Sequence, residues 1–208
     1  MSSRKLSTGV GVLDRQLNGG LPAGSVVSYV APPESQAELL LFELTRARDT
    51  LYVTTDRTEQ AVRDTLEAAG ISSDVRVSYV AGDMPLENAR DVFRDLGEES
   101  NLIIDPVDVL ENADRTRYRN FLNSVRNHMY NTGSIAMLHC LDGNRTPDQR
   151  DTTLHMADVV LDLQMRYDGS DLVTHLAVPK LRGGKALDET VKLQLSDEVR
   201  IDTSRDIA

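Results

Sequence analysis

Apolar residues in this chain alternate between short continuous runs and longer segments of helical periodicity. The short runs have the length of strands, and between them apolar positions recur at the spacing of a helix face. The runs predict strands at Ser25–Ala31, Thr50–Thr55, Val75–Val80, Asn101–Asp105, Ser134–Leu141, Val159–Tyr167, Leu172–Lys180 and Val191–Leu195. The periodic segments predict helices at Glu34–Arg48, Thr58–Ala69, Leu86–Glu98, Arg115–Asn131 and Gln149–Met156. This alternation indicates an α/β fold, with a mostly parallel central sheet and helices on both faces.

The last third of the chain has a different pattern. From Val159 onward the helical periodicity is lost, and Asp168-Gly-Ser170 is typical of a turn between two strands. We therefore expect antiparallel strands that extend the sheet. A chain of 208 residues without a linker, repeat or low-complexity segment is expected to form one domain, residues 1–208.

The sequence gives no indication of a membrane-spanning segment or of a disulfide bond. No apolar stretch approaches the roughly 20 residues of a membrane span, and the N-terminal residues lack an apolar signal segment. The expected location is therefore the cytoplasm. The single cysteine, Cys140, lies in an apolar run and is expected to be a buried strand thiol, so no disulfide forms within one chain.

The charge composition is more informative than the net charge of −10. The chain has 4 lysines against 19 arginines, and 22 aspartates against 11 glutamates. Such an Asp-rich, Lys-poor surface suits a halophilic cytoplasm, because molar salt shortens the Debye length to roughly 3 Å and screens self-repulsion. An ordinary acidic protein is the alternative. Neither reading favours a phosphate-coated partner such as DNA, and no basic patch interleaved with aromatics is present.

The segment between the first strand and the first helix stands where a phosphate-binding loop would stand. Such a loop reads G-x-x-x-x-G-K-[ST], with glycines and lysine on phosphate and a hydroxyl on magnesium. Here the eight positions are Ala31, Pro32, Pro33, Glu34, Ser35, Gln36, Ala37 and Glu38. We expect Pro33 at the first helical position and Glu34 in the first turn, where an acidic side chain supplies the negative charge that a helix N-terminus favours. The pattern predicts a degenerate loop that does not hydrolyse nucleotide.

Several motifs together resemble the KaiC and RadA branch of the RecA-like superfamily. The opening Thr8-Gly-Val-Gly-Val-Leu-Asp14 and Leu17-Asn-Gly-Gly-Leu-Pro-Ala-Gly24 resemble the start of that branch. Leu102-Ile-Ile-Asp105 is similar to a Walker B strand, and Pro179-Lys-Leu-Arg-Gly183 to a late strand of the family. Asp202–Ala208 is similar to the end of haloarchaeal members. The resemblance implies a RecA-like P-loop NTPase fold.

The resemblance also implies positions for vestigial site residues. Asp56 matches the catalytic acid position and is followed by Arg57, which is expected to pair with it or with a neighbouring acid, and a surface pair at the strand end is favoured. Asp105 matches the Walker B aspartate, with a retained fold element favoured.

We expect no catalytic residue, no cofactor and no metal, because Ala37 and Glu38 replace the lysine and the magnesium-binding hydroxyl of the loop. The spacing of Asp108 and Glu111 fits no metal motif either. ATP and Mg²⁺ are expected as ligands only if the loop still binds nucleotide.

In oligomeric relatives the residues matching Lys180 and Arg182 reach across a subunit boundary to the neighbour's nucleotide. Here they are interface candidates for pairing with a partner's Glu34 or Glu38, with solvated strand-end charges as the alternative. His139 lies near the place of a phosphate sensor, with a core histidine favoured. The arginines of Arg115-Thr-Arg-Tyr-Arg119 are read as a solvated helix face.

The expected function is that of a non-hydrolysing regulatory or scaffolding protein, linked to signalling or transcription. It would act through self-association, a RecA-like partner subunit whose site it completes, or an unknown regulatory protein. One alternative is an ATP-binding protein or weak ATPase of the RecA/KaiC type. The other is a recombinase paralogue in DNA repair, against which the net charge of −10 argues. Nucleic acid is not an expected partner, nor is a membrane.

Overall fold

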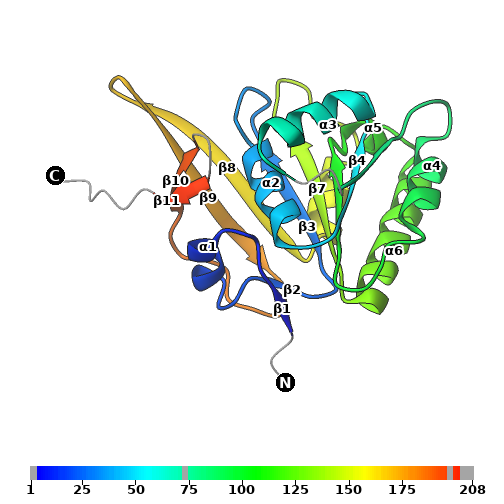
Figure 1. The fold of residues 1–208 in the computed structure, drawn as a ribbon, viewed down its shortest axis with the longest axis horizontal. Coiled ribbons are helices and arrows are strands. Elements are labelled where there is room, and N and C mark those ends of the chain that lie inside the picture. Colours follow the sequence, from blue (N-terminus) through cyan, green and yellow to red (C-terminus); the bar gives the residue numbers. More distant parts are fainter. Residues whose placement is uncertain (1–3, 72–74, 196–198, 202–208) are drawn as a thin grey trace.

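A computed structural model describes residues 4–71, 75–195 and 199–201 of the chain. Within these residues a nine-stranded sheet has the order β11-β10-β9-β8-β3-β7-β6-β4-β5 (Figure 1). Its strands are β3 (Val26–Ala31), β4 (Thr50–Thr54), β5 (Arg76–Tyr79), β6 (Asn101–Asp105), β7 (Ile135–Leu141), β8 (Val159–Asp168), β9 (Asp171–Leu181), β10 (Val191–Leu195) and β11 (Val199–Ile201). β1 (Lys5–Leu6) and β2 (Leu21–Pro22) form a separate antiparallel pair.

The sheet has a parallel part and an antiparallel part. β8, β3, β7, β6, β4 and β5 run parallel, whereas β9, β10 and β11 continue the sheet in antiparallel order. The β8–β9 hairpin extends beyond the rest of the sheet (Figure 1). The predicted α/β class with antiparallel C-terminal strands is therefore confirmed. Every residue of β4 and β6 is buried, as expected for parallel strands that are covered on both faces.

Helices cover both faces of the sheet (Figure 1). They are α1 (Gly11–Gln16), α2 (Glu38–Ala47), α3 (Glu59–Ala68), α4 (Pro85–Phe93), α5 (Asp108–Glu111), α6 (Arg115–Thr132) and α7 (Arg150–Met156). One core joins α1, α2 and α3 to the sheet, around Leu41 and Ile103. The other joins α4, α5 and α6 to the opposite face, around Phe93 and Phe121. None of the helices described has both the length and the apolar character that crossing a membrane requires.

Local capping explains where the well-predicted helices start and stop. The Thr58 side chain accepts a hydrogen bond from the Ala61 amide at the start of α3. Asp114 accepts two backbone amides at the start of α6, and Gly133 ends that helix at a φ of 64°. Both helices lie within a residue of their predicted bounds.

The start of α2 differs from the prediction. This helix begins at Glu38, with Ala37 at its N-cap, so the expectation of Pro33 at the first helical position was wrong. The Ser35 amide and hydroxyl both donate to the Pro32 carbonyl, and this closes a separate turn ahead of the helix. Glu34 is exposed within that turn. The short elements β1, β2, α1, α5 and β11 were not predicted, and the Asp202–Ala208 motif lies outside the described residues.

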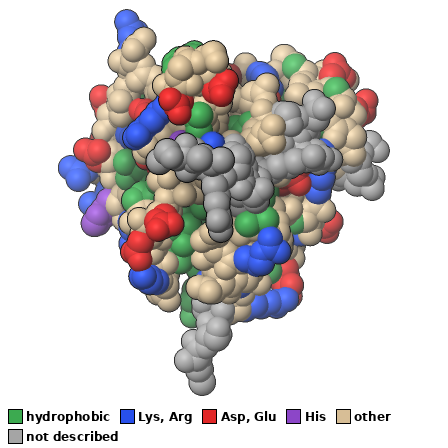
Figure 2. All heavy atoms as spheres, turned by 90° about the vertical axis from the view of Figure 1, so that its left-hand side faces the viewer, with side chains coloured by type: hydrophobic (Ala, Val, Ile, Leu, Met, Phe, Trp, Pro, Cys, Tyr) green, Lys and Arg blue, Asp and Glu red, His purple; other side chains and the backbone are tan. Residues whose placement is uncertain are grey.

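The face built by the C-terminal strands is chemically mixed. Figure 2 shows acidic and basic side chains interspersed over it, with apolar side chains between them. Tyr167 and Leu172, paired across β8 and β9, are exposed. The part of this face that Figure 2 shows in colour carries no large field of one sign of charge.

Candidate functional site

The carboxyl ends of β3, β4, β6 and β7 meet at one edge of the sheet, where ligands bind in open α/β folds. The β3–α2 loop, residues 32–37, lies at this edge beside the residues that follow β4 and β6. Strand register brings Thr54 of β4 opposite Asp105 of β6. Three side chains contact Asp105 here: Tyr52 from β4, Arg57 from the residues that follow β4, and His139 from β7.

Asp105 has hydrogen-bonding partners on both carboxylate oxygens, and its side chain is buried. The Nδ1–H of His139 donates to Oδ1 at 2.6 Å. The Tyr52 hydroxyl and the Arg57 guanidinium both donate to Oδ2, the guanidinium at 3.0 Å. The carboxylate is thus bound on three sides by the protein itself.

The electrostatics of this group follow from its partners. Burial alone would raise the pKa of Asp105, but the hydrogen bond and charge of His139, the Tyr52 hydroxyl and Arg57 together hold that pKa below its ordinary value. Burial and the Asp105 charge in turn push the pKa of Tyr52 well above its ordinary value. Asp105 is therefore ionised, and Tyr52 is a neutral donor, at physiological pH.

Arg57 joins Asp105 to the start of α2. One terminal nitrogen lies 2.9 Å from Glu38 Oε1, and the other lies 3.0 Å from Asp105 Oδ2. Burial lowers the pKa of Arg57, but Glu38, Tyr52 and Asp105 more than offset this, so the pKa is raised. The guanidinium is a fixed cation between two carboxylates.

Asp56 lies next to Arg57 in sequence but takes no part in this bridge. Its side chain is exposed, and its carboxylate forms no hydrogen bond or ion pair with a described residue. Partial burial raises its pKa, with Asp105 and Asp108 adding to the effect. Of the pairings left open by the sequence, Arg57 adopts the one with neighbouring acids.

Contacts with neighbouring residues of the chain hold the β3–α2 loop in place. The Tyr29 hydroxyl donates to the Ala37 carbonyl at 3.3 Å, and the Tyr29 ring stacks on His139 with centroids 5.5 Å apart. Pro33 lies beside Gly143 of the loop after β7. Glu34 and Gln36 are exposed, whereas the methyl group of Ala37 is buried in the core.

These residues do not fit a magnesium-bound triphosphate. In an active P-loop a lysine neutralises phosphate, and a hydroxyl at the helix start joins an aspartate on a neighbouring strand around the metal. The sequence predicts Ala37 at the lysine position and Glu38 and Asp105 at the two metal positions, and in the structure Arg57 lies between these two carboxylates. Among the described residues no three His, Cys, Asp or Glu side chains gather as metal ligands would.

A second ion network lies nearby and involves Arg150, which the sequence did not single out. Arg150 Nε lies 2.9 Å from Glu111 Oε2, and a terminal nitrogen lies 2.8 Å from Asp108 Oδ1. The Leu141 carbonyl accepts from Arg150 at 2.9 Å, and the Thr153 hydroxyl donates to Glu111. Burial raises the pKa of Glu111, and Thr153 and Arg150 only partly offset it. This closed network fixes α5 and α7 to the end of β7.

Lys180 and Arg182 lie at the opposite end of the sheet from Glu38. The Lys180 ammonium donates to the carbonyls of Leu154 at 2.8 Å and His155 at 2.9 Å, at the C-terminus of α7. A terminal nitrogen of Arg182 lies 3.4 Å from Asp158 Oδ1. Both side chains thus have partners within the chain, and their contact with another subunit stays a prediction.

His139 is buried and packs in the core at the end of β7, as favoured for a core histidine. Its Nε2 has no hydrogen-bond partner among the described residues. Tyr52 was missed by the sequence analysis. The available signal was its place on β4, beside the strand that ends in Asp105.

Comparisons with known proteins agree with this architecture. A KaiC-like protein, PH0186, from Pyrococcus horikoshii OT3 matches with a TM-score of 0.78 and 13% sequence identity, over 96% of this chain and 99% of that chain. At this identity the likeness establishes the fold, and it confirms the predicted RecA-like, KaiC-type architecture. A search of the curated proteins finds no match. A family model described as "Family of unknown function (DUF7125)" matches residues 5–208. With the match covering nearly its whole length, the chain belongs to the family of unknown function DUF7125.

Proposed function

We propose that this chain is a non-hydrolysing RecA-fold protein that works as a regulatory or scaffolding subunit. The observation that carries the proposal is the position of Arg57, which bridges Glu38 and Asp105 at 2.9 and 3.0 Å. A covalently attached cation here takes the place that a metal ion has in an active relative. Part of the negative charge at this edge of the sheet is then offset, and the edge is ordered, without any ligand.

A nucleotide switch needs two states that bind the ligand differently. In an active P-loop protein the phosphates and metal supply charge that is present in one state and absent in the other. The Arg57 guanidinium is part of the chain, so its positive charge is present at this site in every state. The bridge therefore removes the difference in charge between the two states on which a nucleotide switch depends. Glu34 and Glu38 also place negative charge around the loop where phosphate would need positive charge. We therefore infer a constitutive scaffold in place of a nucleotide-driven machine.

The proposed partners are further copies of this chain, or a RecA-like subunit whose nucleotide site this chain completes. Lys180 and Arg182 are the proposed contact residues, and a partner's Glu34 or Glu38 is their proposed counterpart. Arg182 retains 46% of its side-chain exposure despite its contact with Asp158, so it is accessible to a second acid. A link to signalling or transcription, and a halophilic cytoplasm, are further parts of the proposal that rest on family analogy and composition.

Isothermal titration of ATP with MgCl₂ in molar KCl tests the proposal, with light scattering giving the solution mass of the same sample. The unmodified chain is expected to give no magnesium-dependent binding heat. The triple variant Ala37→Lys, Glu38→Thr, Arg57→Ala restores the lysine and hydroxyl and removes the bridge, and it is expected to gain magnesium-dependent ATP binding. The matched control keeps Arg57 and changes only Ala37 and Glu38. Magnesium-dependent micromolar binding by the unmodified chain would overturn the proposal.

A further inference from the structure

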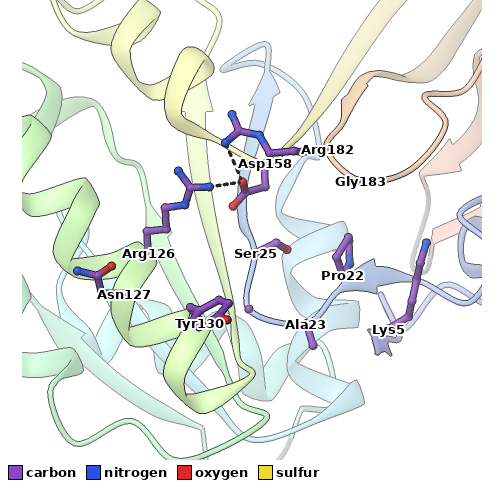
Figure 3. A pocket seen from close by; sticks show the side chains of 11 residues that line it. Lys5, Pro22, Ala23, Ser25, Arg126, Asn127, Tyr130, Asp158, Arg182 and Gly183 are labelled. Atoms are coloured by element: carbon purple, nitrogen blue, oxygen red, sulfur yellow. Dashed lines mark hydrogen bonds and ion pairs between the residues drawn. The ribbon is translucent and has the colours of Figure 1, made fainter. Parts of the chain in front are cut away.

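A cavity of about 660 Å³ lies at the end of the sheet opposite the Arg57 bridge. It lies where β3 begins, beside Ser25, is open to solvent, and is bounded by the C-terminal half of α6 and the turn after β9 (Figure 3). β3 runs from Val26 to Ala31, so about 20 Å of strand separates the cavity from the β3–α2 loop. Its volume lies within the range of small-ligand sites, roughly 300–1,000 Å³.

The lining of this cavity is basic, although the whole chain carries −10. Lys5, Arg126 and Arg182 line it, and Asp158 is the one acid among its lining residues. Figure 3 shows both guanidinium groups directed at the same Asp158 carboxylate. Asp158 Oδ1 lies 3.2 Å from Arg126 and 3.4 Å from Arg182. One carboxylate therefore holds two guanidinium groups side by side and leaves positive charge unmatched.

The other carboxylate oxygen of Asp158 also has a hydrogen-bond partner. Asp158 Oδ2 accepts the backbone amide of Val26 at 3.1 Å, which anchors it to the start of β3. Asp158 thus positions the two arginines, and its charge is the one feature of the cavity that opposes an anion. Each guanidinium carries five N–H donors, so both keep donors for a further acceptor. Lys5 uses one of its three donors on the Leu17 carbonyl.

A buried hydroxyl supplies a second, independent indication of a ligand. Ser25 lines the cavity and is 4% exposed, and its Oγ has no hydrogen-bond partner among the described residues. Buried polar atoms in folded proteins are normally paired, so an orphaned one marks a place where a partner belongs. A ligand acceptor that reaches the floor of the cavity at the start of β3 would supply this partner.

Two other residues of the lining offer flat surfaces to a ring. Tyr130, exposed on α6 like its neighbour Asn127, lies on the same helix as Arg126, and Pro22 lies across the cavity from it (Figure 3). Tyr130 is 79% exposed, so its ring is accessible to a ligand in the cavity. Gly24 holds the chain close to α6, since a Cβ there would lie 3.2 Å from the Tyr130 Cα.

We infer that this cavity binds a small phosphate monoester that carries a ring. Its phosphate would take the unfilled donors of Arg126 and Arg182 together with the Ser25 hydroxyl, and its ring would lie along Tyr130 and Pro22. Phosphate is the matching anion because its oxygens accept several hydrogen bonds at once and suit the guanidinium fork. The site is independent of the Arg57 bridge and of the proposed loss of hydrolysis, although it shares Arg182 with the proposed subunit contact, and its ligand needs no metal.

The test uses AMP, inorganic phosphate and adenosine as probes, by isothermal titration on the full chain with EDTA, at the lowest KCl concentration that keeps it folded. Low salt matters because exposed charges are screened within roughly 10 Å at 0.1 M salt. We expect one AMP per chain, weaker binding of phosphate, and at least about tenfold weaker binding of adenosine. Arg126→Gln is expected to weaken AMP at least about tenfold, and Ser25→Ala several-fold. The matched control, Arg119→Gln, changes an exposed arginine on the same helix outside the cavity and is expected to change nothing.

The inference is overturned if neither AMP nor phosphate binds, or if Arg126→Gln and Arg119→Gln have equal effects. The inference is also overturned if Arg57→Ala loses AMP binding while Arg126→Gln keeps it, because AMP would then bind at the opposite edge of the sheet. The variant Arg126→Lys keeps the positive charge but removes the planar guanidinium, which can donate two hydrogen bonds to one phosphate. Intermediate AMP affinity in that variant supports the inference even if Arg126→Gln folds poorly. If light scattering shows that Arg126 is needed for self-association while AMP does not bind, the cavity is a subunit contact and the inference fails.

Discussion

Arg57 and Asp105 are separated in sequence by α3, β5, α4 and most of β6, yet their side chains meet at 3.0 Å. The Asp105 side chain is 6% exposed and that of Arg57 is 32% exposed, so the pair spans the boundary between core and solvent. The same guanidinium reaches Glu38 at the start of α2. This contact therefore ties three segments of one sheet edge together.

Replacing Arg57 with alanine is expected to destabilise the fold. The change leaves Asp105 buried without its external cation, although His139 and Tyr52 still bind it. We expect a loss of about 1–3 kcal/mol in the free energy of unfolding, below the range for fully buried pairs because Arg57 is partly exposed. Urea unfolding followed by circular dichroism measures it.

The control for that change is Arg94→Ala. Arg94 pairs with Asp91 at 2.7 Å, and both side chains are about two-thirds exposed. An exposed pair of this kind contributes about 0–1 kcal/mol. Equal losses in the two variants would mean that the Arg57 bridge has no special role. In the double variant with Asp105→Asn, the loss from Arg57→Ala should shrink, because the carboxylate charge is gone.

Acid unfolding should report the Asp105 network. Because the folded-state pKa of Asp105 is depressed, its contribution to stability is fully present above its unfolded pKa, about 3.9. That contribution is lost as pH falls through the lower, folded pKa. The stability gap between the natural chain and Asp105→Asn is therefore expected to be constant near neutral pH and to narrow below roughly pH 4. Urea unfolding at a series of pH values measures the gap, and a gap independent of pH over this range contradicts the assignment.

Strands and long helices were predictable where burial or caps leave a local signal. β6 was predicted with its observed bounds because all five of its residues are buried and it ends in a charged residue. α6 was predicted because Asp114 and Gly133 are strong cap residues. α1 has no side-chain cap and owes its place to the packing of Leu13, so its sequence carries little local signal. The start of α2 was misplaced because the turn closed by Ser35 has an acidic, Pro-rich sequence that also suits a first helical turn.

The candidate site was predictable only in part. The missing lysine and hydroxyl of the loop are visible in sequence, and so is the acid that ends β6. The bridge is not visible, because Glu38, Arg57 and Asp105 lie on separate segments whose meeting depends on strand order and register. Tyr52 and His139 reach the same carboxylate from the two strands that flank β6. No spacing rule along one chain encodes contacts of this kind.

Breaking the buried Arg150–Glu111 pair is expected to cost more than breaking the Arg57 bridge. Glu111 has no exposed surface, and Arg150 is also buried. Arg150→Ala should lower the free energy of unfolding by about 3–5 kcal/mol, because it leaves a buried carboxylate without its cation. Urea unfolding measures the loss, and the double variant Arg150→Met, Glu111→Leu should recover part of it. A loss below that of Arg94→Ala would contradict the burial of this pair.

The Cys140 thiol should report global unfolding. Burial is the main reason that its pKa is raised to about 12, and its sulfur lies 3.2 Å from the Ser28 hydroxyl oxygen. Since the thiolate is the reactive form, a thiol reagent at pH 8 should modify the folded chain very slowly and the urea-unfolded chain fast. The reaction with Ellman's reagent measures both rates. A fast reaction of the folded chain would mean that the β7 core opens locally.

Variants of Lys180 distinguish a contact within the chain from a contact between two chains. Its ammonium binds two carbonyls at the end of α7, so Lys180→Met should cost about 0.5–1.5 kcal/mol of stability by the loss of these bonds. If Lys180 also contacts a partner, the mass of the complex measured by light scattering should fall in Lys180→Met and in Arg182→Gln. Lys185→Met is the matched control, because Lys185 is exposed and pairs only with nearby Asp188 among the described residues. A stability loss in Lys180→Met with unchanged mass in both variants would confine these cations to the single chain and would count against the proposed interface.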